Sequence, residues 1–270
     1  MCFILDKNIP AQIYIAEGER ENVLLAAEDL IKDIKRVYGK SEITENLSSA
    51  NVIVCSAQSK EFCSFSHNSF TFSHQEEYRY VVENDKIYLF GADDLGTMWA
   101  IYSFCENELN IPPYYYFDDV KISRRSHIKI ENKTVTDYPR TKFRGWFIND
   151  EDLLGGFKSK SKRDIDYIFY KDIIHPDLME KIVETALRFK INLIIPSTLI
   201  DIHNPTEENL VKIVSKRGLF VSQHHIEPMG VSHFAFEKFA KKFGYDNTQS
   251  FIGNKTAMVA CWKYYAEKWA

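Results

Sequence analysis

Two apolar, strand-like runs in this sequence each end in a cluster of reactive side chains, and this pattern limits the folds that the chain can adopt. The first run reads Lys142-Phe-Arg-Gly-Trp-Phe-Ile-Asn-Asp-Glu-Asp152, and the second reads Gly218-Leu-Phe-Val-Ser-Gln-His-His-Ile-Glu-Pro-Met229. A buried strand needs no carboxylates or imidazoles at its C-terminal end. In a (β/α) barrel, however, the loops after the strands converge on one face, where active sites form. The two runs therefore predict parallel strands with a shared functional edge.

From Thr141 onward, strand patterns alternate with helix patterns, which favours a parallel sheet with right-handed crossovers. A complete (β/α)8 barrel takes roughly 200 residues or more, and only about three βα units are recognisable here. We expect the front portion of a longer enzyme, because a partial barrel exposes an unpaired strand edge; a compact three-stranded derivative is the alternative. Strands are predicted at 143–148, 192–195 and 219–222, and helices at 176–190, 207–216 (with Thr206 as the N-cap), 236–243 and 255–269.

The predicted fold class is α/β, with a small N-terminal α/β domain at residues 1–138 and the first units of a TIM-type barrel at residues 139–270. The boundary is expected in the polar stretch 132–140. Asn84-Asp85 predicts a two-residue hairpin turn. Gly91-Ala-Asp-Asp94 predicts a turn followed by a helix with an aspartate N-cap. The glycine spacing here does not match that of a nucleotide-binding loop. Further strands are expected at 12–15, 51–55, 78–83, 86–90 and 126–131, and helices at 19–38 and from about 95 to 109.

Composition and charge exclude several classes of function. The net charge is −4, so no basic stripe favours nucleic acid as a partner. No apolar run approaches the roughly 18 residues of a membrane span, and no signal peptide is visible at the start of the sequence. The five cysteines are widely scattered and favour reduced thiols in a cytoplasmic protein. We expect no cofactor, and the sequence does not decide whether the chain forms a homo-oligomer.

At the two runs the sequence resembles glycoside hydrolase family 115, the xylan α-1,2-glucuronidases. Arg144-Gly-Trp-Phe-Ile-Asn-Asp-Glu151 is similar to the first barrel strand of that family, and His224-His-Ile-Glu-Pro-Met229 is similar to its third strand, with one inserted residue. The first domain also looks similar at Gly91-Ala-Asp-Asp-Leu-Gly-Thr97 and at Pro113-Tyr-Tyr-Tyr116. The resemblance implies removal of (4-O-methyl)glucuronic acid branches from glucuronoxylan or acidic xylo-oligosaccharides by an inverting mechanism.

Inverting hydrolysis needs a carboxylic acid and a carboxylate about 6.5–9.5 Å apart. The two runs offer the carboxylates Asp150, Glu151, Asp152 and Glu227. The predicted catalytic residues are Asp150, Glu151 and Glu227. The structural alternatives are a solvated acidic loop for the first two and a bond to a neighbouring backbone amide for Glu227. The resemblance also implies that the principal carboxylates of the family follow on later strands. We therefore expect this chain alone to be weakly active or inactive.

Asn149, His224 and His225 are the predicted substrate-binding residues. If the strand continues, the two histidines point to opposite sides, so that one contacts substrate while the other packs. Arg144 lies at the start of its strand, so an ion pair at the base of the barrel is expected rather than a bond to the uronate carboxylate. No metal site is predicted, although a zinc site formed by His225, Glu227 and His233 remains an alternative.

Three functions stay open at this point: a glucuronidase, a non-catalytic carbohydrate-binding remnant, and a metal-dependent hydrolase that uses the histidines. The sequence decides neither the linkage cleaved nor the substrate length, and it does not identify which histidine contacts substrate. It also leaves the oligomeric state undecided.

Overall fold

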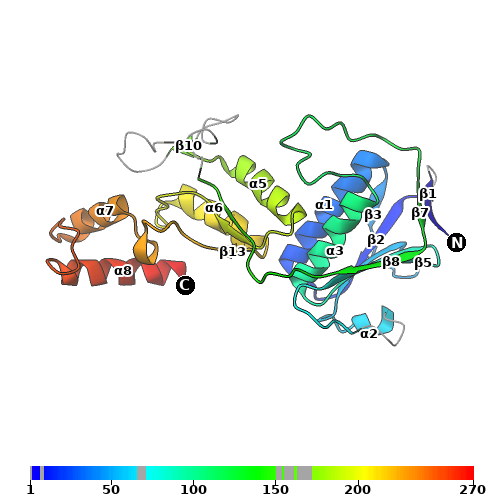
Figure 1. Ribbon diagram of the computed structural model, residues 1–270, viewed down its shortest axis with the longest axis horizontal. Coiled ribbons are helices and arrows are strands. Elements are labelled where there is room, and N and C mark those ends of the chain that lie inside the picture. Colours follow the sequence, from blue (N-terminus) through cyan, green and yellow to red (C-terminus); the bar gives the residue numbers. More distant parts are fainter. Residues whose placement is uncertain (1, 7–8, 66–70, 150–153, 155–160, 163–171) are drawn as a thin grey trace. The chain divides into compact units, whose positions relative to one another are not determined.

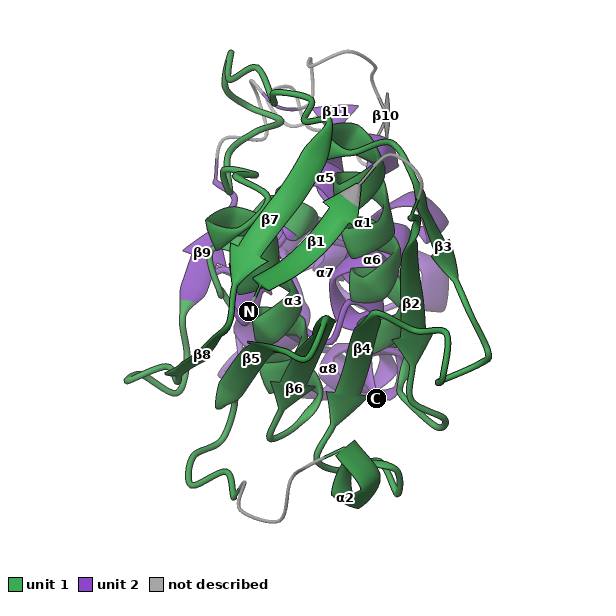
Figure 2. Ribbon diagram, turned by 90° about the vertical axis from the view of Figure 1, so that its right-hand side faces the viewer, with its two compact units in different colours: residues 1–144, 184–191 green, residues 145–183, 192–270 purple. Residues whose placement is uncertain are grey.

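The structure, a computed structural model (Figure 1), describes residues 2–6, 9–65, 71–149, 154, 161–162 and 172–270. Helices and strands occur together in both of its compact units (Figure 2), which confirms the α/β class. Unit 1 contains Met1–Arg144 and Glu184–Ile191, and unit 2 contains Gly145–Val183 and Asn192–Ala270. The predicted boundary after residue 138 lies shortly before Arg144, but unit 1 also includes a later segment.

Unit 1 is built on a six-stranded mixed sheet. Its first four strands in spatial order are parallel, the fifth is antiparallel to both of its neighbours, and every residue of β4 is buried. A continuous buried run of this kind is typical of a central parallel strand. The spatial order is β3 (Ser41–Ile43), β2 (Ala11–Ile15), β4 (Val52–Ser56), β6 (Lys86–Gly91), β5 (Tyr78–Glu83) and β8 (Lys133–Asp137).

Two helices lie side by side on one face of this sheet, α1 (Glu21–Val37) and α3 (Asp94–Asn107) (Figure 1). In α1 the buried apolar residues recur at the three- and four-residue spacing of one helix face, as the sequence predicted. In α3 almost the whole middle of the helix is buried. Between β5 and β6, Asn84 and Asp85 have φ angles of 49° and 60°, as a type I′ turn requires. The predicted hairpin is confirmed.

The glycines before and inside the start of α3 allow close packing. The Asp93 side chain accepts a hydrogen bond from the Gly96 N–H at 2.8 Å, which confirms the predicted aspartate cap. A Cβ on Gly91 would lie 1.9 Å from the Thr97 nitrogen, and one on Gly96 would lie 2.4 Å from the Glu77 oxygen. These positions need glycine because the backbones approach each other closely.

The polar stretch expected to be a linker contains strand β8, which the sequence analysis missed. β8 pairs antiparallel with β5 at the edge of the sheet, and four of its five residues are exposed. An edge strand with little buried surface carries no apolar alternation, so the pattern gave no signal. The expected strand at 126–131 is present as β7 (His127–Glu131), which pairs with another unpredicted strand, β1 (Cys2–Asp6).

Unit 2 contains a three-stranded parallel sheet in the order β13 (Phe220–Val221), β12 (Leu193–Ile195), β9 (Gly145–Phe147). All three strands were predicted, although each is shorter than expected. The predicted helix at 176–190 is α5, whose last turn belongs to unit 1. The other elements are a strand pair, β10 (Ser161–Lys162) and β11 (Asp172–Ile173), the helices α5 (Pro176–Arg188), α6 (Pro205–Lys216), α7 (His233–Phe243) and α8 (Lys255–Trp269), and the 3₁₀ helix η1 (Pro228–Gly230).

Two helix starts differ from the sequence prediction. The N-cap of α6 is Asn204, whose side-chain oxygen accepts from the Thr206 N–H at 3.1 Å, so the predicted Thr206 cap is wrong. Pro205 takes the first helical position, where its missing N–H costs nothing. Helix α7 begins at His233 rather than Phe236, because Ser232 caps it through the Ala235 N–H.

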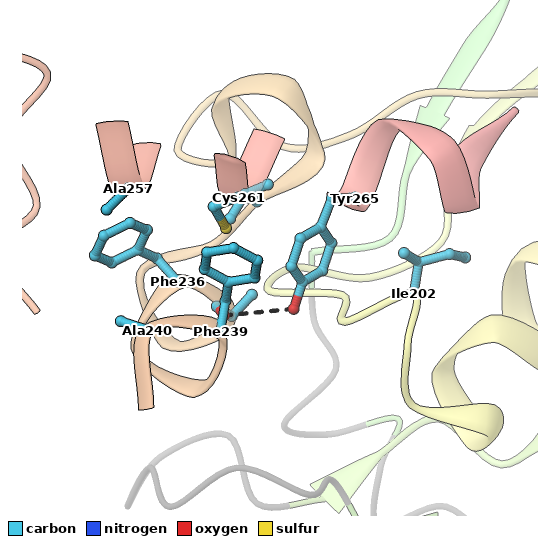
Figure 3. Packing of buried hydrophobic residues seen from close by; sticks show 9 residues of the cluster. Ile202, Phe236, Phe239, Ala240, Ala257, Cys261 and Tyr265 are labelled. Atoms are coloured by element: carbon cyan, nitrogen blue, oxygen red, sulfur yellow. Dashed lines mark hydrogen bonds between the residues drawn. The ribbon is translucent and has the colours of Figure 1, made fainter. Parts of the chain in front are cut away.

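The last two helices enclose a core of their own in unit 2. Figure 3 shows Phe236 and Phe239 of α7 facing Cys261 and Tyr265 of α8. The Tyr265 hydroxyl donates to the Ala235 carbonyl at 3.4 Å and to the Asp201 carboxylate at 3.1 Å. Its buried oxygen is therefore hydrogen-bonded, which offsets the cost of burying a tyrosine hydroxyl in a core.

A buried ion network ties the end of α5 into unit 1. Arg188 is 3% exposed, and its guanidinium lies 2.8 Å from Asp33 of α1 and 2.9 Å from Glu184. The guanidinium also lies 5.3 Å from the Tyr102 ring centroid and 4.9 Å from that of Tyr115. Because Asp33 is fully buried, its charge depends on this partner.

Arg188→Met should lower the free energy of unfolding by about 3–5 kcal/mol, because it leaves a buried carboxylate without its main partner. The matched control is Arg36→Met, since Arg36 pairs with the same carboxylate but its side chain is 34% exposed. The control should cost about 1 kcal/mol or less. Urea unfolding measures both variants, and equal losses would contradict the assigned role of Arg188.

Candidate functional site

The central strand of the unit 2 sheet brings three strand ends to one edge. Leu193 of β12 pairs with Gly145 of β9 on one side and with Phe220 of β13 on the other, all in parallel. The pairing continues past the strands, where the Ile148 N–H donates to the Ile195 carbonyl at 2.9 Å. Carboxyl ends of parallel strands meet at one edge, so the chain after β9 and the chain after β13 emerge together.

A side chain of β9 and one from the turn after β13 meet at this edge. The rings of Phe147 and His224 have centroids 4.9 Å apart and planes tilted by 31°. Ile148 is buried and the next residue, Asn149, is exposed. The predicted substrate-binding residues Asn149 and His224 therefore follow strands that end at the same edge. The first and third strands flank β12 rather than pairing with each other, and their long side chains span the gap.

The two histidines lie beside each other. Their ring centroids are 4.0 Å apart. The expectation that they point to opposite sides required the strand to continue through them, and it does not. Strand β13 ends at Val221, and the chain then turns, with the Glu227 N–H donating to the His224 carbonyl at 3.0 Å. The alternation of an extended strand no longer applies in a turn. His225 is exposed and His224 is half-buried.

Glu227 lies under this turn rather than on the surface. It is 4% exposed, and its carboxylate accepts from the His224 N–H at 3.2 Å. This is the backbone-amide bond considered as an alternative to catalysis. The turn continues through Met229 and Gly230, with φ angles of 59° and 72°. A buried carboxylate bonded to the loop backbone fixes the position of the histidines.

The surroundings of His224 favour its neutral form. Burial lowers its pKa below the ordinary value of 6.5, and the nearby His225 lowers it further. The Nδ1 atom of His224 is buried without a hydrogen-bond partner among the described residues. A neutral imidazole has one donor and one acceptor nitrogen, so it is able to donate a hydrogen bond to a sugar hydroxyl or to accept one from it.

Asp150 and Glu151, the two predicted catalytic residues after β9, lie outside the described residues. Their roles, like those of Asn149, His224, His225 and Glu227, stay predictions. The described part of the chain contains no group of three or more His, Cys, Asp or Glu side chains suited to hold a metal ion. The imidazole of His233, the third residue in the zinc alternative, lies 3.0 Å from the Glu237 carboxylate.

A pair of buried carboxylates follows β12, and the sequence analysis did not identify it. Asp201 is 1% exposed and accepts from Tyr265 and from the Lys238 ammonium at 3.0 Å. Glu207 is fully buried and accepts from the Asp201 N–H at 2.9 Å and from Asn204 at 3.0 Å. The sequence did contain a signal for this capping arrangement, because Glu207 stands at the third helical position of α6 after an Asn cap. The network orders the loop after β12.

The sequence model of glycosyl hydrolase family 115 matches residues 136–270, which include all three strand ends. No curated protein matches the chain. Among solved structures, the chain is similar to a family GH115 4-O-methyl-α-glucuronidase with specificity for decorated arabinogalactans, at a TM-score of 0.80 and 20% identity. The match covers 98% of this chain and 35% of that one, so the chain spans about a third of that enzyme.

Two hexosaminidases are more distant structural relatives. Thio-NAglucal-bound N-acetyl-β-hexosaminidase from Streptomyces plicatus has a TM-score of 0.58 at 12% identity, covering 89% of this chain and 46% of its own. The exo-β-N-acetylglucosaminidase of Vibrio harveyi has a TM-score of 0.52 at 11% identity, and the match covers 83% of this chain and 33% of that one.

None of the helices in the described residues has the length and apolar character of a membrane span.

His225→Ala should raise the pKa of His224 toward its ordinary value, because it removes the charge repulsion and also opens the turn to water. Titration of the His224 ring proton by NMR measures this shift. The control is His127→Ala, an exposed histidine of β7, which should leave the His224 midpoint unchanged. An unchanged midpoint in His225→Ala would contradict the repulsion between the two rings.

Proposed function

Because the chain belongs to glycosyl hydrolase family 115, we propose that it forms the front part of a glycoside hydrolase that removes (4-O-methyl)glucuronic acid branches from xylan or acidic xylo-oligosaccharides. The relative with the same architecture is a 4-O-methyl-α-glucuronidase. The observation that carries the proposal is the contact between Phe147 and His224. It joins the two strand ends within the stretch that the family model matches.

The proposed substrate site is the edge formed by the ends of β9 and β13. Asn149 and His225 are exposed there, and amide and imidazole groups suit sugar hydroxyls. His224, neutral at pH 7, orients a hydroxyl by accepting or donating a hydrogen bond. Phe147 packs against its ring and limits the directions in which the imidazole points.

For the chemical step we propose direct displacement by water. One carboxylic acid protonates the leaving oxygen while a carboxylate takes a proton from the attacking water, and the two stand about 6.5–9.5 Å apart. Asp150 and Glu151 are the candidates for these roles from this chain. Burial and its bond to the His224 amide favour a positioning role for Glu227, with proton transfer as its alternative.

Turnover by this chain alone is proposed to be low. The chain spans about a third of its glucuronidase relative, and the resemblance implies that further carboxylates follow on later strands. The alternative function is a carbohydrate-binding remnant that holds a uronate branch without cleaving it. The exposure of Asn149 and His225 supports binding under either proposal.

Incubation with glucuronoxylan should give slow release of free uronate, measured by chromatography. Asp150→Asn should reduce this release by roughly 10²–10⁴-fold, the usual contribution of general acid–base catalysis. The control is Glu131→Gln, an exposed carboxylate of β7, which should leave the rate unchanged. Fast release would show that the carboxylates in this chain suffice, and release untouched by Asp150→Asn would remove that residue from the mechanism.

Binding tests the site independently of turnover. A glucuronic-acid-substituted xylo-oligosaccharide should bind the chain saturably in calorimetry, and His224→Ala should weaken binding roughly tenfold, as the loss of one buried hydrogen-bonding group predicts. His127→Ala is the matched control. Saturable binding without release would favour the binding remnant, whereas binding unaffected by His224→Ala would place the sugar elsewhere.

A further inference from the structure

Unit 1 contains a pocket built from residues that the proposed function does not use. It has a volume of about 570 Å³ and lies between the loop Ser73–Glu76, which precedes β5, and the segment Tyr138–Lys142, which follows β8. The antiparallel pairing of Tyr78 with Asp137 brings these two segments together. A pocket of this volume accommodates a monosaccharide or a larger ligand.

A stack of three side chains forms one wall of the pocket. The His74 ring lies parallel to the Tyr138 ring, with centroids 3.7 Å apart and an angle of 3°. The Arg140 guanidinium lies 4.1 Å from the Tyr138 ring centroid and also donates to the Tyr138 hydroxyl. Two groups at these distances cannot share one face, so Tyr138 lies between them. The stack orients the guanidinium before any ligand arrives.

The carboxylates at the pocket are engaged by other groups. Glu76 accepts from Trp99 at 2.9 Å and pairs with Arg144. Glu77 accepts from the backbone N–H groups of Ser73 and His74 at 2.8 and 3.1 Å. Within the described residues, Arg140 forms no ion pair with a carboxylate. The cation that lines this pocket on the Tyr138 stack is therefore available to an anion.

We propose that this pocket binds the carboxylate of a uronic-acid sugar through Arg140, as a second carbohydrate site separate from the strand-end site in unit 2. The choice of a sugar acid rests on the proposed function, which gives the substrate a carboxylate on each branch. A guanidinium matches a carboxylate with two parallel hydrogen bonds. Lys142 adds positive charge, and Ser73 and Gln75 line the pocket with groups suited to hydroxyls.

Such a site holds the polymer near the enzyme without taking part in cleavage. Branches along one polysaccharide are covalently linked, so binding one branch in unit 1 raises the local concentration of the others. The contact is partly exposed and electrostatic, so the affinity for a single sugar is expected to be weak and to fall with added salt.

NMR titration of the ¹⁵N-labelled chain with D-glucuronate tests the proposal at this site. The Arg140 Nε–H signal, assigned by its absence from Arg140→Gln, should shift with the Gln75 and Thr141 amides, with a Kd on the order of 1 mM. D-glucose, which lacks the carboxylate, should bind at least about tenfold more weakly. Inorganic phosphate tests for a general anion site.

In Arg140→Gln the shifts of Gln75 and Thr141 should require roughly tenfold more glucuronate. Arg124→Gln, an exposed arginine outside the pocket, should titrate like the unchanged chain, and equal thermal unfolding midpoints show that both variants are folded. Equal affinity of Arg140→Gln would overturn the proposal, as would phosphate binding as tightly as glucuronate. Because the shifts are read in unit 1, the result is independent of uronate release from the unit 2 site.

Discussion

The parallel pairing of β12 with a strand on each side is the constraint on which the candidate site depends. Leu193 sets the register for both neighbours, and the backbone bonds continue through Ile148 and Ser222. A slip of one residue in either strand would turn its side chains to the other face. Phe147 and His224 meet because both registers are fixed by the same strand.

The parts of the fold that the sequence predicted are those in which local physics and tertiary structure agree. Helix α1 has one apolar face, and Asn84-Asp85 adopts the positive φ angles that its turn type demands. Strand β8 was missed because its stability comes from pairing with β5 rather than from its own pattern. Thr206 was predicted as the cap of α6, but Asn204 is the cap, because Pro205 takes the first helical position and both Asn and Thr are capping residues.

For the candidate site, the sequence located the strand ends but not the arrangement of the side chains. The histidine pair was expected to alternate, but the turn after Val221 places the rings together. Glu227 was predicted to be catalytic, with a bond to a neighbouring backbone amide as the alternative, and the structure shows it buried and bonded to the His224 amide. Turn geometry of this kind depends on contacts made only after the chain has folded, and no local pattern specifies it.

Arg140 and Arg144 lie close together in the chain, and they show that resemblance to the family motif does not decide whether an arginine is available to bind an anion. Arg144 belongs to the family-like motif, yet its guanidinium is occupied by Glu76 and by the carbonyl of Lys190 at 2.6 Å. The expected ion pair is present, with a partner from unit 1. Arg140 lies outside the motif and stacks on Tyr138 without a carboxylate partner in the described residues. A guanidinium already satisfied by buried partners gains little from a ligand, whereas an oriented and unpaired one gains a charge-assisted bond. Anion binding in this segment is therefore governed by the surroundings of each arginine rather than by its place in a recognisable motif.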